Sequence, residues 1–413
     1  MMNLKKTCIA LCCSMAVFLT ACNDDDGERF YGQPAPLYLS EQPYQKDTLQ
    51  NAESIKVMRY KMQGVNNKHV EATALVMYPK MARPADGWRV VVWEHGTVGS
   101  GDSCAPSNNN LHVRFKPLAE ELLSKGYVIV APDYEGLGVK GVHTYLHLES
   151  AANAAIYAVK AFSQQHGKHF NGAWSSVGQS QGGHASLGTA EFADDLNMNY
   201  KAAVAAAPAS SLGYIIGTIA PAALLQLSLG EQANLVPKGS ARDVYAELLA
   251  YAAYVGVGIT AYKPDFKYLD IFEQRSQPFV AQAEGSTGDN GLCLDELMSA
   301  FKNDIDAFTV ANPDKTAADY PGLKKGFEQI PEVAEFLNVN QPATKKINVP
   351  VMIIQGEKDM AVPVQVTEQL KMKLEGFGTV VDWQMVPGAS HTAAIVQRQN
   401  ELVSFIEKHM PAK

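Results

Sequence analysis

A serine set between glycines is the feature that most constrains this chain. Residues 178–182 read Gly-Gln-Ser-Gln-Gly, after a short apolar run at 173–177 and before a helical segment at 184–193. A serine at so sharp a strand-to-helix turn is forced into a strained backbone conformation, and glycines two residues to either side remove side chains that would clash. The turn exposes the Ser180 hydroxyl beside a helix N-terminus, where free N–H groups stabilise negative charge. The pattern predicts a nucleophile, and a plain glycine-rich turn is the alternative.

The remaining chain alternates strands and helices on both sides of this turn. It has 413 residues, of which 46% are hydrophobic, so it can bury a large core. A hairpin is predicted at 55–63 and 69–78. Further strands are predicted at 89–93, 127–131, 173–177, 202–207, 349–355 and 380–386, and helices at 111–125, 150–165, 184–193, 364–374 and 392–409. This alternation predicts an α/β fold with a mostly parallel sheet and helices on both faces.

The alternation stops after Pro208 and resumes only at 349. We therefore expect a core made of residues 51–208 and 346–413, with a helical cap inserted at 209–345. No charged residue occurs from 202 to 230, and the stretch from 212 to 230 is long enough to span a bilayer.

A membrane span there would place strands of one sheet on opposite sides of a membrane. This would be avoided only if the stretch 212–230 and a second apolar stretch, 245–262, spanned the membrane together as a hairpin. The second stretch contains Glu247 as its only charged residue. We instead expect cap helices that pack on the sheet, or that line an acyl pocket and touch a lipid interface. The sequence leaves these two arrangements open.

The first residues have the features of an export signal. Two lysines precede an apolar run at 9–20, which predicts a signal peptide over 1–21. The run ends in Leu-Thr-Ala before Cys22, which resembles a bacterial lipobox, so we expect lipidation of Cys22 and a tether over 22–50. An ordinary signal with a chance cysteine is the alternative. Asn23 is not the Asp associated with inner-membrane retention, which favours an exported lipoprotein of the outer membrane.

Charge and cysteine content narrow the possible partners. A net charge of −8 argues against nucleic acid as a partner. Once the signal is removed and Cys22 is lipidated, only Cys104 and Cys293 remain. Two cysteines in an oxidising compartment indicate one disulfide, with free thiols or a metal pair as weaker alternatives.

A serine nucleophile needs a base, and the base needs an orienting carboxylate. Asp359 follows the predicted strand 349–355, and His391 follows the strand 380–386. The order Ser, Asp, His, each at the end of a strand, predicts a catalytic triad of Ser180, Asp359 and His391. Glu357 is the alternative acid. His184, one turn beyond Ser180, is expected to pack or form hydrogen bonds beside the site.

Acyl transfer also requires N–H donors for the oxyanion. One is predicted to be the backbone N–H of Gln181, the residue after the nucleophile. The other is predicted in the loop after strand 89–93, at Thr97, with Gly96 as the alternative. This chemistry requires no metal and no organic cofactor.

With these residues assigned, the chain resembles α/β-hydrolase serine esterases, and more narrowly the secretory lipase family that includes fungal lipase A. The resemblance covers residues 55–410 and is carried by His-Gly-Thr at 95–97, Cys-Ala-Pro-Ser at 104–107, Pro-Asp-Tyr-Glu-Gly-Leu-Gly at 132–138, the serine turn and the two carboxyl-terminal loops. It implies the α/β-hydrolase fold, hydrolysis of acyl esters, a helical cap, and a disulfide from Cys104 to the cap cysteine Cys293. The chain departs from the fungal pattern at the serine turn, which reads Gly-Gln-Ser-Gln-Gly-Gly where the fungal turn reads Gly-Tyr-Ser-Gly-Gly, and it departs again in having a lipobox.

These features predict a membrane-tethered esterase or lipase that acts on a small-molecule or lipid ester. A serine peptidase or an acyltransferase with the same triad is the alternative among enzymes. A surface lipoprotein without catalytic activity, which binds a ligand, a lipid or a partner through the same fold, is the alternative outside enzymes.

Overall fold

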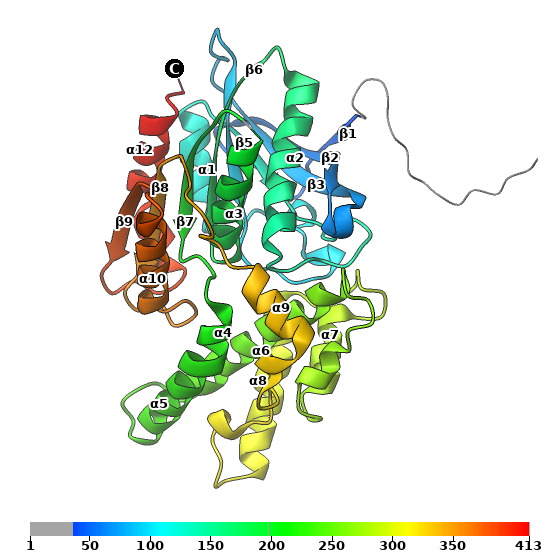
Figure 1. Ribbon diagram of the computed structural model, residues 1–413, viewed down its shortest axis with the longest axis vertical. Coiled ribbons are helices and arrows are strands. Elements are labelled where there is room, and N and C mark those ends of the chain that lie inside the picture. Colours follow the sequence, from blue (N-terminus) through cyan, green and yellow to red (C-terminus); the bar gives the residue numbers. More distant parts are fainter. Residues whose placement is uncertain (1–35, 197, 413) are drawn as a thin grey trace, which may run out of the picture. The chain divides into compact units, whose positions relative to one another are not determined.

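The computed structural model describes residues 36–196 and 198–412. Its centre is a nine-stranded sheet in the order β1-β2-β3-β5-β4-β6-β7-β8-β9 (Figure 1). The strands are β1 (Tyr38–Pro43), β2 (Ala52–Gln63), β3 (His69–Pro79), β4 (Trp88–Glu94), β5 (Val128–Pro132), β6 (Phe170–Gln179), β7 (Tyr200–Ala206), β8 (Val351–Gly356) and β9 (Val381–Val386). The predicted α/β architecture is confirmed.

The pairing of the strands follows from their sequences. β2 and β3 form the predicted antiparallel hairpin, with Met62 opposite Val70. From β5 to β9 neighbouring strands are parallel, and β5 and β8 are buried along their whole length. Runs of Val, Ile and Ala are what strands covered on both faces require, because neither face meets water.

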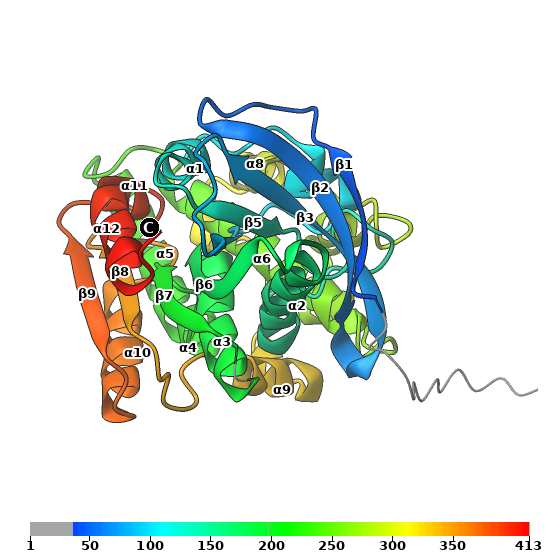
Figure 2. The same cartoon turned by 90° about the horizontal axis from the view of Figure 1, so that it is seen from above.

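Helices cover both faces of the sheet. α2 (Leu148–His166), α3 (Gln181–Asp195) and α10 (Val364–Gly376) pack into the hydrophobic core on one face. α1 (Phe115–Ser124), α11 (Ala393–Gln397) and α12 (Gln399–His409) pack into the core on the other face, and Figure 2 shows the sheet between the two layers.

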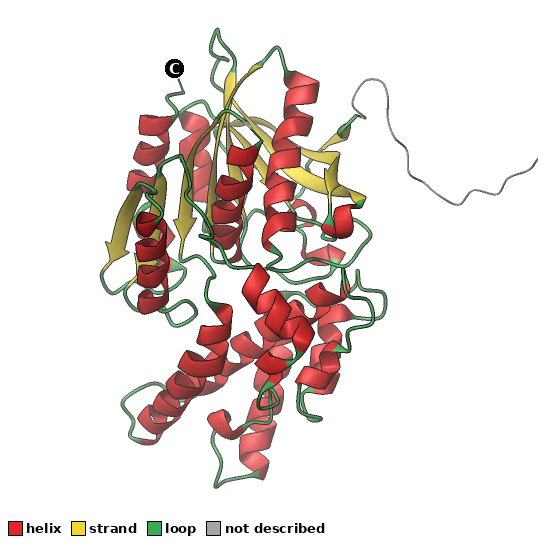
Figure 3. Cartoon of the chain, viewed as in Figure 1, coloured by secondary structure: helices red, strands yellow, loops and turns green. Residues whose placement is uncertain are grey.

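All the cap helices lie between β7 and β8, at the carboxyl ends of the parallel strands (Figure 3). They are α4 (Leu212–Tyr214), α5 (Ala220–Gln232), α6 (Ser240–Thr260), α7 (Gln277–Glu284), α8 (Leu294–Ala311) and α9 (Pro331–Val339). These helices share a hydrophobic core of their own, centred on residues such as Tyr254 and Phe301.

One cap helix exposes an apolar surface. α4 and α5 join through a π-helical turn, Ile215–Ile219, into one helical segment, Leu212–Gln232. It is the one described helix long and apolar enough to cross a membrane, yet only 28% of its most apolar window is buried. Its α5 part packs on α6 and on the short turn Ala317–Asp319, and it leaves Leu225 and Leu229 exposed.

Three sequence expectations need correction. The tether predicted over 22–50 is wrong for residues 36–50, because β1 pairs with β2 and the side chains of Tyr44 and Leu49 enter the core. The helix predicted from 111 begins only at Phe115, and the final helix predicted over 392–409 is broken at Arg398, whose φ of −112° and ψ of 19° are not helical. The signal peptide, Cys22 and tether residues 22–35 lie outside the described residues.

Candidate active site

Ser180 occupies the sharp turn between β6 and α3. Its φ is 61°, a left-handed conformation that is strained for a serine. A Cβ on Gly178 would lie 2.0 Å from the carbonyl oxygen of Gly182, and one on Gly182 would lie 1.8 Å from the carbonyl oxygen of Glu94. Both positions therefore require glycine, and the turn has the geometry that the sequence predicts.

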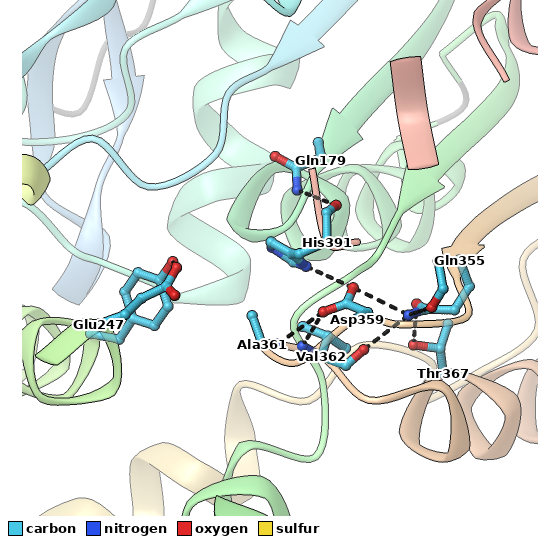
Figure 4. A network of polar contacts seen from close by, with 10 residues as sticks. Gln179, Glu247, Gln355, Asp359, Ala361, Val362, Thr367 and His391 are labelled. Atoms are coloured by element: carbon cyan, nitrogen blue, oxygen red, sulfur yellow. Dashed lines mark hydrogen bonds and ion pairs between the residues drawn. The ribbon is translucent and has the colours of Figure 1, made fainter. Parts of the chain in front are cut away.

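Asp359 and His391 meet in the loops that follow β8 and β9. His391 Nδ1 lies 2.8 Å from Asp359 Oδ2 (Figure 4). The Asp359 side chain is 0% exposed, whereas that of His391 is 13% exposed. The other carboxylate oxygen of Asp359 accepts hydrogen bonds from the backbone N–H groups of Ala361 and Val362, at 2.9 and 2.8 Å. The carboxylate is thus fixed, and it orients the imidazole ring.

A cavity of about 590 Å³ joins this pair to the serine, since Ser180 and His391 both line it. It lies between the carboxyl ends of the strands and the cap, with Met298 of α8 among its lining residues. The three residues predicted as a triad are thus brought to one place, Asp359 behind His391 and both Ser180 and His391 open to the cavity. Glu357, the alternative acid, accepts a hydrogen bond from the N–H of Gly388 instead.

Two glutamines that the sequence analysis missed support the site. Gln355, buried at the end of β8, donates to Asp359 Oδ2 at 3.2 Å and to the Val362 carbonyl at 2.9 Å. Gln179, the residue before the nucleophile, donates to the carbonyl of His391 at 3.3 Å. A polar side chain at the end of an otherwise apolar strand, as in β8, is the signal that could have identified Gln355.

Of the predicted oxyanion donors, Thr97 lines the same cavity, as does the alternative Gly96. The Thr97 hydroxyl is 2.7 Å from the Tyr145 hydroxyl, which connects this loop to the segment that precedes α2. Gln181 is the first residue of α3, so its N–H belongs to the free N-terminal turn of that helix. Its side chain is buried, and the side-chain Nε2 lies 3.3 Å from His143 Nε2.

Comparisons with known proteins show similarity in sequence to parts of this chain. Residues 294–412 match the Prolyl oligopeptidase family. A segment of 78 residues is 31% identical to Acyl-protein thioesterase 1 from Gibberella zeae, a match that covers 19% of this chain and 33% of that protein.

Similarity in fold extends over nearly the whole described chain. Lipase A from Candida antarctica, in its closed state, aligns with a TM-score of 0.66 at 16% identity, over 91% of this chain and 82% of that one. The rice cell wall degrading esterase LipA from Xanthomonas oryzae aligns with a TM-score of 0.64 at 17% identity, over 91% and 99% of the two chains. The chain has the α/β-hydrolase fold. The expected resemblance to lipase A is confirmed, and the relatives of this chain are hydrolases.

In this α/β-hydrolase, the motif at 132–138 braces the loop that carries Thr97. The buried carboxylate of Asp133 accepts hydrogen bonds from the Thr73 hydroxyl at 2.7 Å and from the Ser107 N–H at 3.0 Å. The Tyr134 hydroxyl donates to the carbonyl of His95 at 3.0 Å. The motif therefore has a structural role that explains its position after β5.

Four histidines are held neutral by burial. Desolvation lowers the pKa of each to about 4, and they are His95, His143, His147 and His184. His184 is fully buried and its Nε2 lies 2.9 Å from the carbonyl of Asn340. It thus connects α3 to the end of α9, as the expectation of a packing residue requires.

Cys104 and Cys293 form a disulfide at the wall of the cavity. Their sulfurs are 2.11 Å apart, and both residues line the cavity. The bond joins the loop after β4 to the residue that caps α8. Among residues 36–196 and 198–412, no group of three or more His, Cys, Asp or Glu side chains could hold a metal ion.

Proposed function

We propose that this α/β-hydrolase cleaves carboxylic acyl esters through a Ser180–His391–Asp359 triad. The observation that carries the proposal is the 2.8 Å contact between His391 Nδ1 and Asp359, at the wall of a cavity that Ser180 also lines. A carboxylate bound to Nδ1 holds the histidine in the tautomer whose Nε2 can accept a proton. Only the base and the nucleophile need to meet the substrate, and these two residues line the cavity.

In the proposed reaction, the Ser180 oxygen attacks the ester carbonyl carbon while His391 Nε2 takes the hydroxyl proton. The tetrahedral oxyanion accepts hydrogen bonds from the N–H groups of Gln181 and Thr97. As the carbonyl re-forms, the alcohol leaves with the proton from His391, and the acyl group stays on Ser180. A water molecule, deprotonated by His391, then releases the acid and restores the serine.

The first test is hydrolysis of p-nitrophenyl esters from acetate to palmitate, with Ser180→Ala as the control. We expect the substitution to lower kcat by at least about 10³-fold, because it removes the nucleophile, and to leave the unfolding temperature unchanged. Wild-type protein should also be labelled by a fluorophosphonate, and the variant should not. Activity retained by the variant would contradict the assignment of Ser180.

A peptidase is the second candidate, favoured by the match of residues 294–412 to the Prolyl oligopeptidase family. It would use the same triad with an amine as leaving group. Ser180-dependent cleavage of aminoacyl p-nitroanilides, without cleavage of p-nitrophenyl esters that carry long acyl chains, would favour the peptidase. An acyltransferase would instead pass the acyl group to an added alcohol in preference to water.

We further propose that the enzyme works at a membrane surface, tethered by a lipidated Cys22. The lipobox-like sequence before Cys22 and the exposed apolar segment Leu212–Gln232 support this placement. Cells fed a radiolabelled fatty acid should incorporate label into the wild-type protein. The Cys22→Ser variant should lack the label and appear in the soluble fraction, and its persistence in the membrane fraction would contradict the tether.

A further inference from the structure

The cap brings two acidic side chains to the catalytic cavity, Glu247 on α6 and Asp295 on α8. Glu247 and Tyr251 stand one helical turn apart on α6, and both line the cavity that contains Ser180 and His391. Figure 4 shows Glu247 facing the space on the opposite side from His391. A carboxylate in this position will meet whichever part of the substrate extends from the reacting ester toward the cap.

The side chain that is hydrogen-bonded to Glu247 is neutral. The Tyr251 hydroxyl donates to Glu247 Oε1 at 2.5 Å. Burial, with the nearby carboxylate of Glu247, raises the pKa of Tyr251 well above its ordinary value, so the hydroxyl keeps its proton. A hydroxyl donor orients the carboxylate but does not cancel its charge.

Two further charged residues line the cavity, Arg114 and Asp295. Burial lowers the pKa of Arg114, and its electrostatic interactions with Tyr251 and with Asp295 oppose that shift. His112, also in the lining, has its pKa lowered by burial and by Arg114, which favours the neutral ring. Among the described residues, the lining thus holds one cation, Arg114, and two carboxylates, Asp295 and Glu247, so negative charge is in excess there, and Glu247 supplies the carboxylate on α6.

Aromatic rings complete the surroundings that a cation requires. Trp93 and Phe115 line the cavity and stack on each other, with ring centroids 4.7 Å apart. The ring of Tyr251 stands beside the Glu247 carboxylate, and the two stacked rings line the same cavity. Aromatic faces and carboxylates both attract ammonium ions.

We infer that the substrate is an ester carrying a cationic ammonium group, bound by Glu247 among these aromatic rings. This inference rests on the proposed esterase function and names its substrate class. The carboxylate then acts as a specificity determinant, because it attracts the charged part of the substrate and not the reacting carbonyl.

The test compares pairs of esters that differ in one atom. A choline ester is compared with the isostere in which carbon replaces the quaternary nitrogen. The p-nitrophenyl ester of a trimethylammonio-alkanoic acid is compared with its carbon isostere in the same way. We expect kcat/KM to favour the cationic member of at least one pair by about tenfold. This preference should decrease at high salt, which screens a charge interaction in an open cavity.

Glu247→Gln should bring the ratio of the cationic to the neutral ester close to one. Asp243→Asn is the matched control, because Asp243 lies one turn away on α6 and forms ion pairs with Arg242 and Lys302 outside the cavity. The control should keep the wild-type ratio. If Glu247→Gln proves unstable, the salt dependence of the wild-type ratio still decides the question.

The outcomes separate this inference from the proposed function. Hydrolysis of neutral esters that depends on Ser180, with no preference for either cationic ester, would overturn the inference and leave the esterase proposal standing. The wild type could instead prefer glycerol esters over cationic esters, and Glu247→Gln could remove that preference. This result would also overturn the inference, and it would show that Glu247 binds hydroxyl groups of the substrate. Absence of Ser180-dependent activity on every ester would reject the proposed function itself.

Discussion

At the scale of single residues, the site depends on side chains that are absent as much as on those present. The serine turn packs so closely on the end of β4 that the Glu94 carbonyl occupies the space where a side chain on Gly182 would begin. The same contact brings the nucleophile beside the loop that carries Thr97. The glycine is therefore part of the catalytic geometry.

We expect Gly182→Ala to lower the free energy of unfolding by at least about 3 kcal/mol, since backbone atoms cannot move aside as a flexible side chain would. Gly217→Ala is the control, because a Cβ there has no atom within 4 Å. In this helical position alanine should raise stability by about 0.5–1 kcal/mol. Urea unfolding measures both, and equal effects would contradict the packing argument.

A second residue-scale prediction concerns Glu94. Burial raises the pKa of its carboxyl well above the ordinary 4.5, although a hydrogen bond from Thr189 opposes this shift. Between those two pKa values the folded protein keeps a proton that the unfolded chain has lost, so this group's contribution to stability falls as pH rises. Glu94→Gln cannot ionise, and its stability relative to the wild type should therefore increase from pH 4.5 toward neutrality.

Urea unfolding across that pH range measures the Glu94 effect. Glu53→Gln, a substitution of an exposed carboxylate, is the control and should follow the wild-type pH profile. If the free energy of unfolding of Glu94→Gln changes with pH in parallel with that of the wild type, the buried carboxyl does not cause the pH dependence of stability.

At the scale of elements, the segment Leu212–Gln232 departs from the usual rule for an apolar helix. A helix that is apolar all round is normally buried in a core or in a membrane. Here α5 buries Leu224 against the cap, where it is 5% exposed, and leaves the next residue, Leu225, 55% exposed. Leu224 thus lies on the side of the helix that stabilises the fold, and Leu225 lies on the side that is free to contact a lipid interface.

Alanine at these two positions should have different effects. Leu224→Ala should cost about 2–5 kcal/mol, because it leaves a cavity in the cap core. Leu225→Ala should change the free energy of unfolding by less than about 0.5 kcal/mol, and any loss it causes should appear in binding to lipid vesicles. Thermal unfolding and vesicle flotation measure the two effects, and a large loss of stability from Leu225→Ala would place that side chain in the core.

At the scale of the whole molecule, the disulfide fixes the cap to the sheet. Cys104 and Cys293 are 189 residues apart in the sequence. Closing so long a loop in the unfolded chain is worth about 5 kcal/mol in the chain-entropy description. The double substitution Cys104→Ser and Cys293→Ser should lower the unfolding temperature, and chemical reduction of the wild type should lower it to the same value. Reduction that has no effect on unfolding would contradict a stabilising bond.

Much of the fold could be predicted from the sequence because its causes are local. Runs such as residues 89–93 and 349–355 are too apolar to be anything but buried strands, and the predicted hairpin at 55–63 and 69–78 forms as expected. The tether prediction failed for residues 36–50. Scattered apolar residues such as Tyr44 and Leu49 carry no periodic signal, and β1 exists because β2 offers an open edge.

The sequence by itself determined the serine turn, the order of Ser180, Asp359 and His391, and the pairing candidates Cys104 and Cys293. Glycine spacing, strand ends and a count of cysteines are properties of short segments or of composition. Only the tertiary structure decided that Gln355 holds Asp359, that Gln179 holds the His391 loop, and that Glu247 faces the catalytic cavity. These contacts join elements far apart in the chain, and which side chains meet there depends on how helices pack over the ends of the strands.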